Sequence, residues 1–156
     1  MLIKPNRADF GEHSGTGKKQ MTKIVHYQLR YWLPVYLYAL AIFLSSHQSR
    51  LSIPIKIIGI DKILHFVAYG LFTGLIYRAC RKSQKAVISQ KAYLISLICS
   101  ILYGFSDEFH QFYIPGRQTS AWDFMADALG AIVAIIIILK CFPDKNTQAS
   151  PDGHQP

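Results

Sequence analysis

The sequence predicts an all-α fold, a membrane bundle of four transmembrane helices with disordered polar termini. Of the 156 residues, 51% are hydrophobic, and most of these lie in four long stretches. Mean hydropathy is only slightly positive because both ends of the chain are polar and dilute the apolar middle. A helix needs roughly 17 to 25 residues to cross the hydrocarbon core of a bilayer, and each stretch approaches that length. The stretches are residues 31–46, 63–79, 92–105 and 121–142.

Each stretch has its own evidence for a membrane helix. The first follows basic residues as a secretory signal does, but it begins late and lacks a small-residue cleavage site, so we expect a retained signal anchor. The second carries Gly70 and Gly74, a spacing typical of close helix packing. The third reaches spanning length only if its helix continues through Asp107. The fourth is apolar on every side of a helical wheel over residues 130–139.

A single domain is expected between two tails. We predict a transmembrane domain at residues 23–142, a disordered basic N-terminal tail at residues 1–22 and a disordered C-terminal tail at residues 143–156, because both tails are polar. A soluble four-helix bundle is the alternative, and it is disfavoured because too few polar faces exist to cover its helices.

The formal net charge of +8 is mainly an orientation signal. Basic residues gather before the first helix, between the second and third, and after the fourth. By the positive-inside rule, both termini and the middle connection should be cytoplasmic in a multi-pass protein of the bacterial plasma membrane. Nucleic-acid binding is disfavoured because these residues flank membrane helices and form no recognisable binding module.

Acids, histidines and other polar residues converge on the opposite, extracytoplasmic face. An isolated carboxylate at the centre of a bilayer costs roughly 2.5 to 3.5 kcal/mol, so such groups usually face a bundle interior or a watery cavity. Polar residues recur every three or four positions along the second and third helices, and the two stripes should face each other. The second helix has Asp61, His65, Tyr69 and Thr73, and the third has Ser96, Ser100, Tyr103, Asp107 and Gln111. We therefore predict one polar site.

Two sets of residues are candidates for this site. The first set suits catalysis, by proton transfer or by holding a metal ion. Its members are His65, Asp107, Glu108, His110 and Asp127. The second set suits binding of a ligand, with Arg117 able to hold a carboxylate or phosphate in a fork. Its members are Ser45, Asp61, Gln111, Arg117 and Asp123.

Structural roles remain open for the same residues. Arg117 would equally serve to neutralise the acids, and the histidines to hydrogen-bond within the bundle. The oxygen and imidazole groups suit zinc, manganese or iron, but no motif fixes a geometry, so neither a metal nor a cofactor is identified. Covalent catalysis is disfavoured because no nucleophilic serine or cysteine motif accompanies them.

Several runs of residues resemble the VanZ-like family of small bacterial integral membrane proteins. The runs are Asp61-Lys-Ile-Leu-His65-Phe-Val-Ala-Tyr69, Tyr103-Gly-Phe-Ser-Asp107-Glu-Phe-His110-Gln111, Pro115-Gly-Arg117 and Asp123-x-x-x-Asp127-x-x-Gly130. The resemblance covers residues 32–139, and the departures at His47 and Ala134 touch loop shape and packing. The family is named for a glycopeptide-resistance accessory protein linked to teicoplanin tolerance, so the resemblance implies a membrane protein connected with the cell envelope and antibiotic resistance.

Two classes of function follow from these observations. In the first, the protein is an envelope-facing membrane enzyme that binds or modifies an anionic envelope or lipid-linked intermediate. In the second, it is a non-catalytic accessory or binding protein, of undetermined oligomeric state. Proton-coupled transport is a weaker third alternative, because four short helices leave little room for alternating halves.

Overall fold

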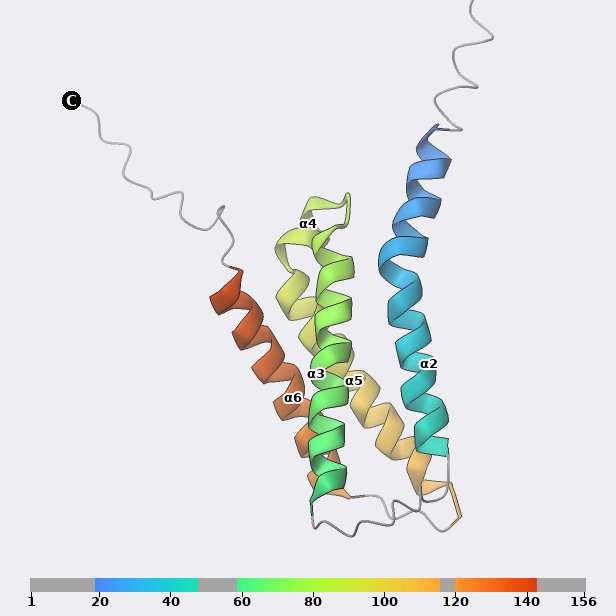
Figure 1. Ribbon diagram of the computed structural model, residues 1–156, viewed down its shortest axis with the longest axis vertical. Helices are drawn as coiled ribbons and strands as arrows, with labels where there is room; N and C mark the ends of the chain where they lie inside the picture. Colours follow the sequence, from blue (N-terminus) through green and yellow to red (C-terminus); the bar gives the residue numbers. More distant parts are fainter. Residues whose placement is uncertain (1–18, 48–58, 116–119, 143–156) are drawn as a thin grey trace, which may run out of the picture.

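The computed structural model describes residues 19–47, 59–115 and 120–142, and these are almost entirely helical. Four helices in these ranges are long and apolar enough to span a membrane: Lys19–His47, Ile60–Arg81, Ala92–Phe112 and Ala121–Cys141. The predicted all-α bundle of four transmembrane helices is thus confirmed (Figure 1). The labelled elements are η1 (Gln28–Trp32), α2 (Leu33–His47), α3 (Ile60–Arg81), α4 (Ala86–Gln90), α5 (Ala92–Phe112) and α6 (Ala121–Cys141).

The first helix is longer than the sequence predicted. Residues 19–22 are helical although we assigned them to a disordered tail, and the helix passes through the π-helical segment η1 before α2. Aromatic residues hold the N-terminal part of this helix against α3. The Tyr27 hydroxyl donates to the Ala79 carbonyl at 2.7 Å, and the Arg78 guanidinium lies 5.0 Å from the centre of the Tyr31 ring. The remainder of both predicted tails lies outside the described residues.

Helix α3 is the central element and contacts α6, α5 and α2. Its closest approach is to α6, where Gly70 faces the Gly130 carbonyl. A Cβ atom on Gly130 would collide with the carbonyl group of Phe66, so only glycine fits there. By contrast, a Cβ atom on Gly74 would meet nothing within 4 Å, and the packing role that the sequence suggested for Gly74 is wrong.

Large apolar side chains cover the outside of the bundle, while its inside holds small and polar residues together with an apolar core that includes Phe72 and Ile76. Leu37, Leu71 and Leu102 are each more than half exposed, as suits helices that face lipid. Inside, the Thr73 hydroxyl lies 2.8 Å from the Ser100 hydroxyl, and both residues are fully buried. The two polar stripes therefore meet at Thr73 of α3 and Ser100 of α5, as their spacing predicted for this part of the helices.

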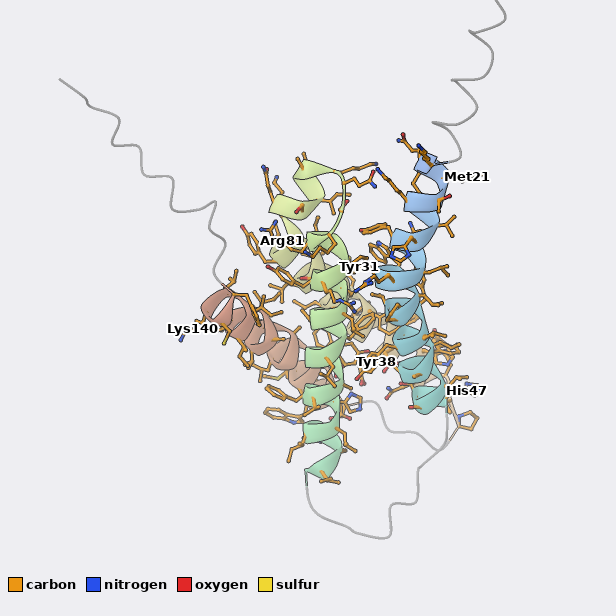
Figure 2. All side chains as sticks on the ribbon, turned by 45° about the horizontal axis from the view of Figure 1, so that its top comes forward. Met21, Tyr31, Tyr38, His47, Arg81 and Lys140 are labelled. Carbon is orange, nitrogen blue, oxygen red and sulfur yellow. The ribbon has the colours of Figure 1, made fainter. Side chains whose placement is uncertain are left out.

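The bundle has two ends, which are defined by where its helices begin and finish. Helices α2 and α5 finish, and α3 and α6 begin, at the lower end of Figure 1, which we call the polar end. The opposite end, which we call the basic end, holds the start of the first helix and the finish of α3 and α6. Figure 2 shows Met21 and Arg81 toward this second end and His47 far from them. The candidate site residues that the structure describes lie at the polar end.

Candidate functional site

Three helices bring one ionisable residue each to a common point near the polar end. His65 on α3, Glu108 on α5 and Asp127 on α6 place potential ligand atoms within 4.8 Å of one another. We call these residues the His65 cluster. His65 Nδ1 lies 2.9 Å from Asp127 Oδ1, and the Asp127 side chain is only 1% exposed. At 1.5 Å per residue, the cluster lies about 6 to 9 Å inside the helix ends.

Glycine allows these helices to approach one another at the cluster. A Cβ atom on Gly104 of α5 would lie only 3.3 Å from Asp127 Oδ2 and 3.2 Å from Cε1 of the Tyr69 ring. The absence of a side chain at Gly104 therefore admits both Asp127 and Tyr69. One turn away on α6, Gly130 permits the tight contact with α3 that sets the spacing between His65 and Asp127.

Several buried polar atoms at this point have no hydrogen-bond partner among the described residues. They are the Tyr69 hydroxyl, Glu108 Oε1 and Asp127 Oδ2. Tyr69 and Asp127 are each 1% exposed. A buried polar atom without a partner costs about 1 to 3 kcal/mol, and most such atoms in folded proteins are satisfied. An unfilled set of three from three helices therefore favours a site that receives a ligand.

Glu108 is tied to the start of α6 through its other oxygen. Glu108 Oε2 accepts a hydrogen bond at 3.3 Å from the backbone amide of Ser120, which precedes the first residue of α6. This bond orients the partly buried carboxyl group, and Oε1 remains directed into the protein interior. The site thus uses both the α5 side chain and the helix start of α6.

Asp107 belongs to a different arrangement from its neighbour Glu108. Its Oδ2 accepts hydrogen bonds from the Ser46 hydroxyl at 2.7 Å and from Gln111 Nε2 at 2.9 Å. All three residues are buried, and they join α5 to α2. We call them the Asp107 network. The sequence grouped Asp107 with His65; in the structure its hydrogen bonds run to α2 and along α5, while it still lies near enough to Asp127 to interact with it electrostatically.

Ser45 and His110 also lie away from the His65 cluster. The Ser45 hydroxyl donates to the Ala41 carbonyl at 2.8 Å on an exposed part of α2, whereas its neighbour Ser46 enters the Asp107 network. His110 Nε2 lies 3.4 Å from His47 Nδ1 at the surface. The sequence predicted a site position for Ser45 and not for Ser46, since only helix rotation distinguishes the two.

A lysine that the sequence analysis did not select lies between two candidate acids at the mouth of the bundle. Lys62 Nζ is 2.8 Å from Asp61 Oδ2 and 3.1 Å from Asp123 Oδ1, which links the starts of α3 and α6. The Asp61 side chain is 55% exposed and that of Asp123 12%. Asp123 therefore faces the bundle while Asp61 faces outward. Arg117, predicted to cover the acids, lies outside the described residues.

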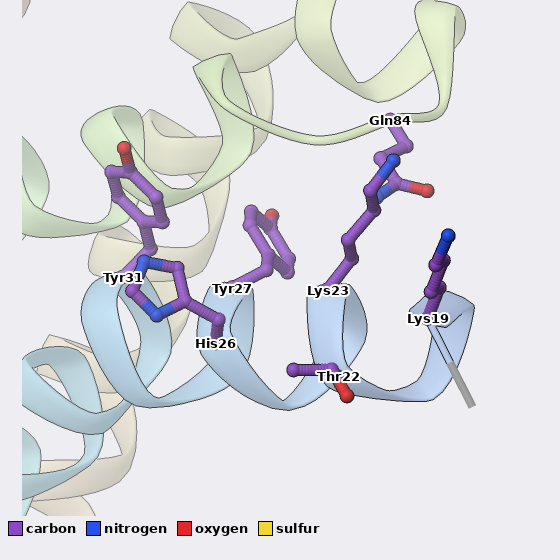
Figure 3. A pocket seen from close by; sticks show the side chains of 7 residues that line it. All are labelled: Lys19, Thr22, Lys23, His26, Tyr27, Tyr31 and Gln84. Atoms are coloured by element: carbon purple, nitrogen blue, oxygen red, sulfur yellow. The ribbon is translucent and has the colours of Figure 1, made fainter.

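A hollow of about 620 Å³ lies at the basic end, far from these groups. Figure 3 shows Lys23 and Lys19 on the first helix projecting toward Gln84, with Tyr27 and Tyr31 further along the same helix. Its lining contains cationic and aromatic side chains and no acid. The hollow therefore shares no residue with the candidate site.

Comparison with known proteins assigns the chain to a family. The family model described as VanZ/LLP1 matches residues 6–142, a range that includes all candidate site residues. No curated protein and no solved structure matches the chain significantly. With four helices able to span a membrane and a match over most of its length, the chain is a membrane protein that belongs to the VanZ/LLP1 family.

Proposed function

We propose that this protein lies in the bacterial plasma membrane with the polar end facing the cell envelope and both chain termini in the cytoplasm. The charge distribution supports this orientation. Basic residues such as Lys23, Arg81 and Lys140 occupy the basic end, which the positive-inside rule assigns to the cytoplasm. The acids of the His65 cluster then open toward the envelope.

A topology experiment tests the orientation independently of any ligand. A reporter fused after Lys85 should be active only as a cytoplasmic marker, and one inserted at Ile55 only as an extracytoplasmic marker. Lys85 lies in the connection between α3 and α5, and Ile55 precedes α3 in the chain. The reverse pattern would refute the envelope-facing site.

We propose further that the polar end binds and acts on the anionic head group of an envelope or lipid-linked molecule. The observation that carries this proposal is the contact between the partly buried His65 and the buried Asp127, with Glu108 beside it and open acceptors on both acids. An aspartate that accepts a hydrogen bond from His65 Nδ1 leaves a lone pair on Nε2, which can either take a proton from water or a hydroxyl group or ligate a metal ion. The cluster thus suits proton transfer or metal binding.

The depth of the cluster supports an amphipathic ligand. The cluster lies about 6 to 9 Å inside the helix ends, which is close to the boundary between head groups and acyl chains. Exposed apolar residues surround the bundle, so the chain of a lipid-linked molecule can pack against it while its head group reaches the polar end. A freely soluble ligand would not contact this apolar surface.

A binding experiment with a matched control tests the proposed ligand class. Purified protein in nanodiscs should retain a short-chain prenyl diphosphate or phosphatidylglycerol, detected by native mass spectrometry. His65→Gln should weaken this binding at least about tenfold. The same exchange in His26→Gln, at the basic end, should leave it unchanged. Equal binding by His65→Gln and the unchanged protein would refute the proposal.

The alternative proposal is a non-catalytic accessory role in glycopeptide tolerance. It is favoured by family membership and by the Asp107 network, in which a conspicuous acid is already satisfied by protein groups. Expression in a teicoplanin-sensitive strain distinguishes the two. An enzyme should lose its effect on the inhibitory concentration in His65→Gln, whereas an accessory protein that acts through its surface should keep it.

A further inference from the structure

We propose that His65, Glu108 and Asp127 hold a single divalent transition-metal ion, Zn²⁺ or Mn²⁺, where α3, α5 and α6 meet. The use of this ion rests on the proposed function, because the ion would bind the anionic head group. Its binding does not rest on that function and can be measured alone. The inference therefore deepens the role of the His65 cluster and names what the cluster binds first.

The spacing of the three side chains fits one ion. Their candidate ligand atoms, a ring nitrogen of His65 and one carboxylate oxygen each from Glu108 and Asp127, lie within 4.8 Å of one another. With metal–ligand bonds of about 2.0 to 2.2 Å, two ligands of one ion lie about 3 to 4.4 Å apart. Small side-chain rotations, without movement of the helices, bring the atoms into this range.

The open acceptors of the cluster provide independent support for an ion. Asp127 Oδ2 and Glu108 Oε1 are buried and have no partner among the described residues. Buried carboxylates without cations are rare because their charge loses its hydration. The nearby cation Lys62 pairs with Asp61 and Asp123 instead. A divalent ion would satisfy both open oxygens and balance both charges.

Asp107 provides an internal comparison for this argument. Asp107 is also a buried residue, but Ser46 and Gln111 donate to its Oδ2. Protein groups therefore satisfy this acid without an ion. Asp107, whose Oδ2 has two donors, and Glu108, whose Oε1 has none among the described residues, are adjacent on α5. Burial in an apolar bundle therefore does not by itself leave a carboxylate oxygen without a partner.

The donor set selects the class of metal and leaves room for a ligand. Imidazole suits zinc and other transition metals, and carboxylates also suit manganese. Three protein ligands leave at least one coordination position for water or for an oxygen of an anionic head group. The Tyr69 ring borders the same Gly104 contact as Asp127, so its unpartnered hydroxyl can donate to a ligating carboxylate or to that oxygen.

Metal binding can be measured on the full chain without an activity assay. The protein is purified in detergent, stripped with a chelator and titrated with Zn²⁺ or Mn²⁺, and bound metal is counted by mass spectrometry. We expect about one ion per chain in the unchanged protein. Asp127→Asn and Glu108→Gln, which keep side-chain size, should each weaken binding at least about tenfold. Substituted Co²⁺ should show a visible spectrum that both variants alter.

The chain offers two controls for this experiment. Asp107→Asn removes a buried carboxylate one position from Glu108 and should keep one ion. His47→Ala combined with His110→Ala removes the surface histidine pair, in which two imidazoles face each other. If that double variant loses the ion while Asp127→Asn and Glu108→Gln keep it, the inference is wrong. Circular dichroism and gel filtration of each variant identify those that fail to fold.

Failure of this inference is distinguishable from failure of the proposed function. Binding of the prenyl diphosphate by chelator-treated protein with no stoichiometric metal would refute the ion and retain the function. One tightly bound ion per chain with no binding of the prenyl diphosphate or phosphatidylglycerol would support the ion and refute the proposed function. If the metal-loaded protein binds the diphosphate and the stripped protein does not, both proposals are supported.

Discussion

Asp107 and Glu108 are consecutive residues on α5, yet they belong to two different polar regions. Asp107 accepts hydrogen bonds from Ser46 and Gln111 and joins α5 to α2. Glu108 has an open oxygen and lies with the ionisable groups of α3 and α6. A buried polar region with filled acceptors stabilises the fold, whereas one with open acceptors is available to a ligand. The comparison separates an acid that joins two helices from an acid whose open oxygen favours a ligand.

The largest effect should come from breaking the close contact between α3 and α6, on which the His65 cluster depends. In Gly130→Ala, the new methyl group would collide with the Phe66 carbonyl, and the backbones of α3 and α6 would have to separate. We expect the free energy of unfolding in detergent to fall by about 3 kcal/mol or more. Chemical unfolding followed by circular dichroism measures this change.

Gly74→Ala is the matched control on the same helix pair. A methyl group there meets nothing within 4 Å, and alanine favours helix over glycine by about 0.5 to 1 kcal/mol. The variant should be as stable as the unchanged protein or slightly more stable. Equal losses in the two variants would show that the contact between Gly130 and Phe66 does not set the position of α6.

The second prediction concerns the different losses expected for the two buried aspartates. Asp107→Asn weakens two hydrogen bonds to a charged acceptor and should cost about 1.5 to 3 kcal/mol in stability. Asp127→Asn keeps an oxygen that can accept from His65 and removes the charge on the unpartnered oxygen, so the metal-free protein should lose less stability than Asp107→Asn. Unfolding of both variants in chelator measures the difference. A larger loss for Asp127→Asn would contradict the division into two regions.

The sequence predicted the helices and their polar end because both depend on features that a linear pattern displays. Apolar length identified four spans, and polar groups near one end of each span, acids in three of them, identified the face. The stripe through Ser100 and Asp107 was also informative, since Ser100 meets Thr73 of α3. The VanZ-like resemblance added the family, which the match over residues 6–142 confirms.

The partners of individual side chains were harder to predict, since they depend on helix rotation and on distances between backbones. Neighbouring residues of a helix point about 100° apart, so Asp107 and Glu108 face different helices. The same rotation separates Ser45 from Ser46. Gly70 and Gly74 could not be told apart by their spacing. A Cβ atom added at Gly70 would contact α6, whereas one added at Gly74 would meet nothing within 4 Å. No local pattern contains these interhelical distances.

The third prediction sharpens the account of the Asp107 network with two adjacent serines. Ser46→Ala removes a buried donor to Asp107 and should lower the free energy of unfolding by about 1 to 2 kcal/mol. Ser45→Ala removes a hydroxyl on an exposed part of α2 and should change it by less than about 0.5 kcal/mol. Neither variant should alter metal content. Loss of metal in Ser46→Ala would join the two regions into one site.

The smallest effect should come from Lys62, which bridges the mouth of the bundle. Lys62→Gln removes a cation that is 41% exposed, so solvent screening limits the loss of stability to less than about 1 kcal/mol. Asp123, left without its lysine, is still favoured by its position in the first turn of α6.

The variant also removes positive charge near the His65 cluster, so the affinity for Zn²⁺ should rise by about twofold to fivefold at low ionic strength and by less in high salt. Isothermal titration at two salt concentrations measures this change. Weaker zinc binding in Lys62→Gln would contradict the expected repulsion between Lys62 and the ion, and with it the charge argument for the metal site.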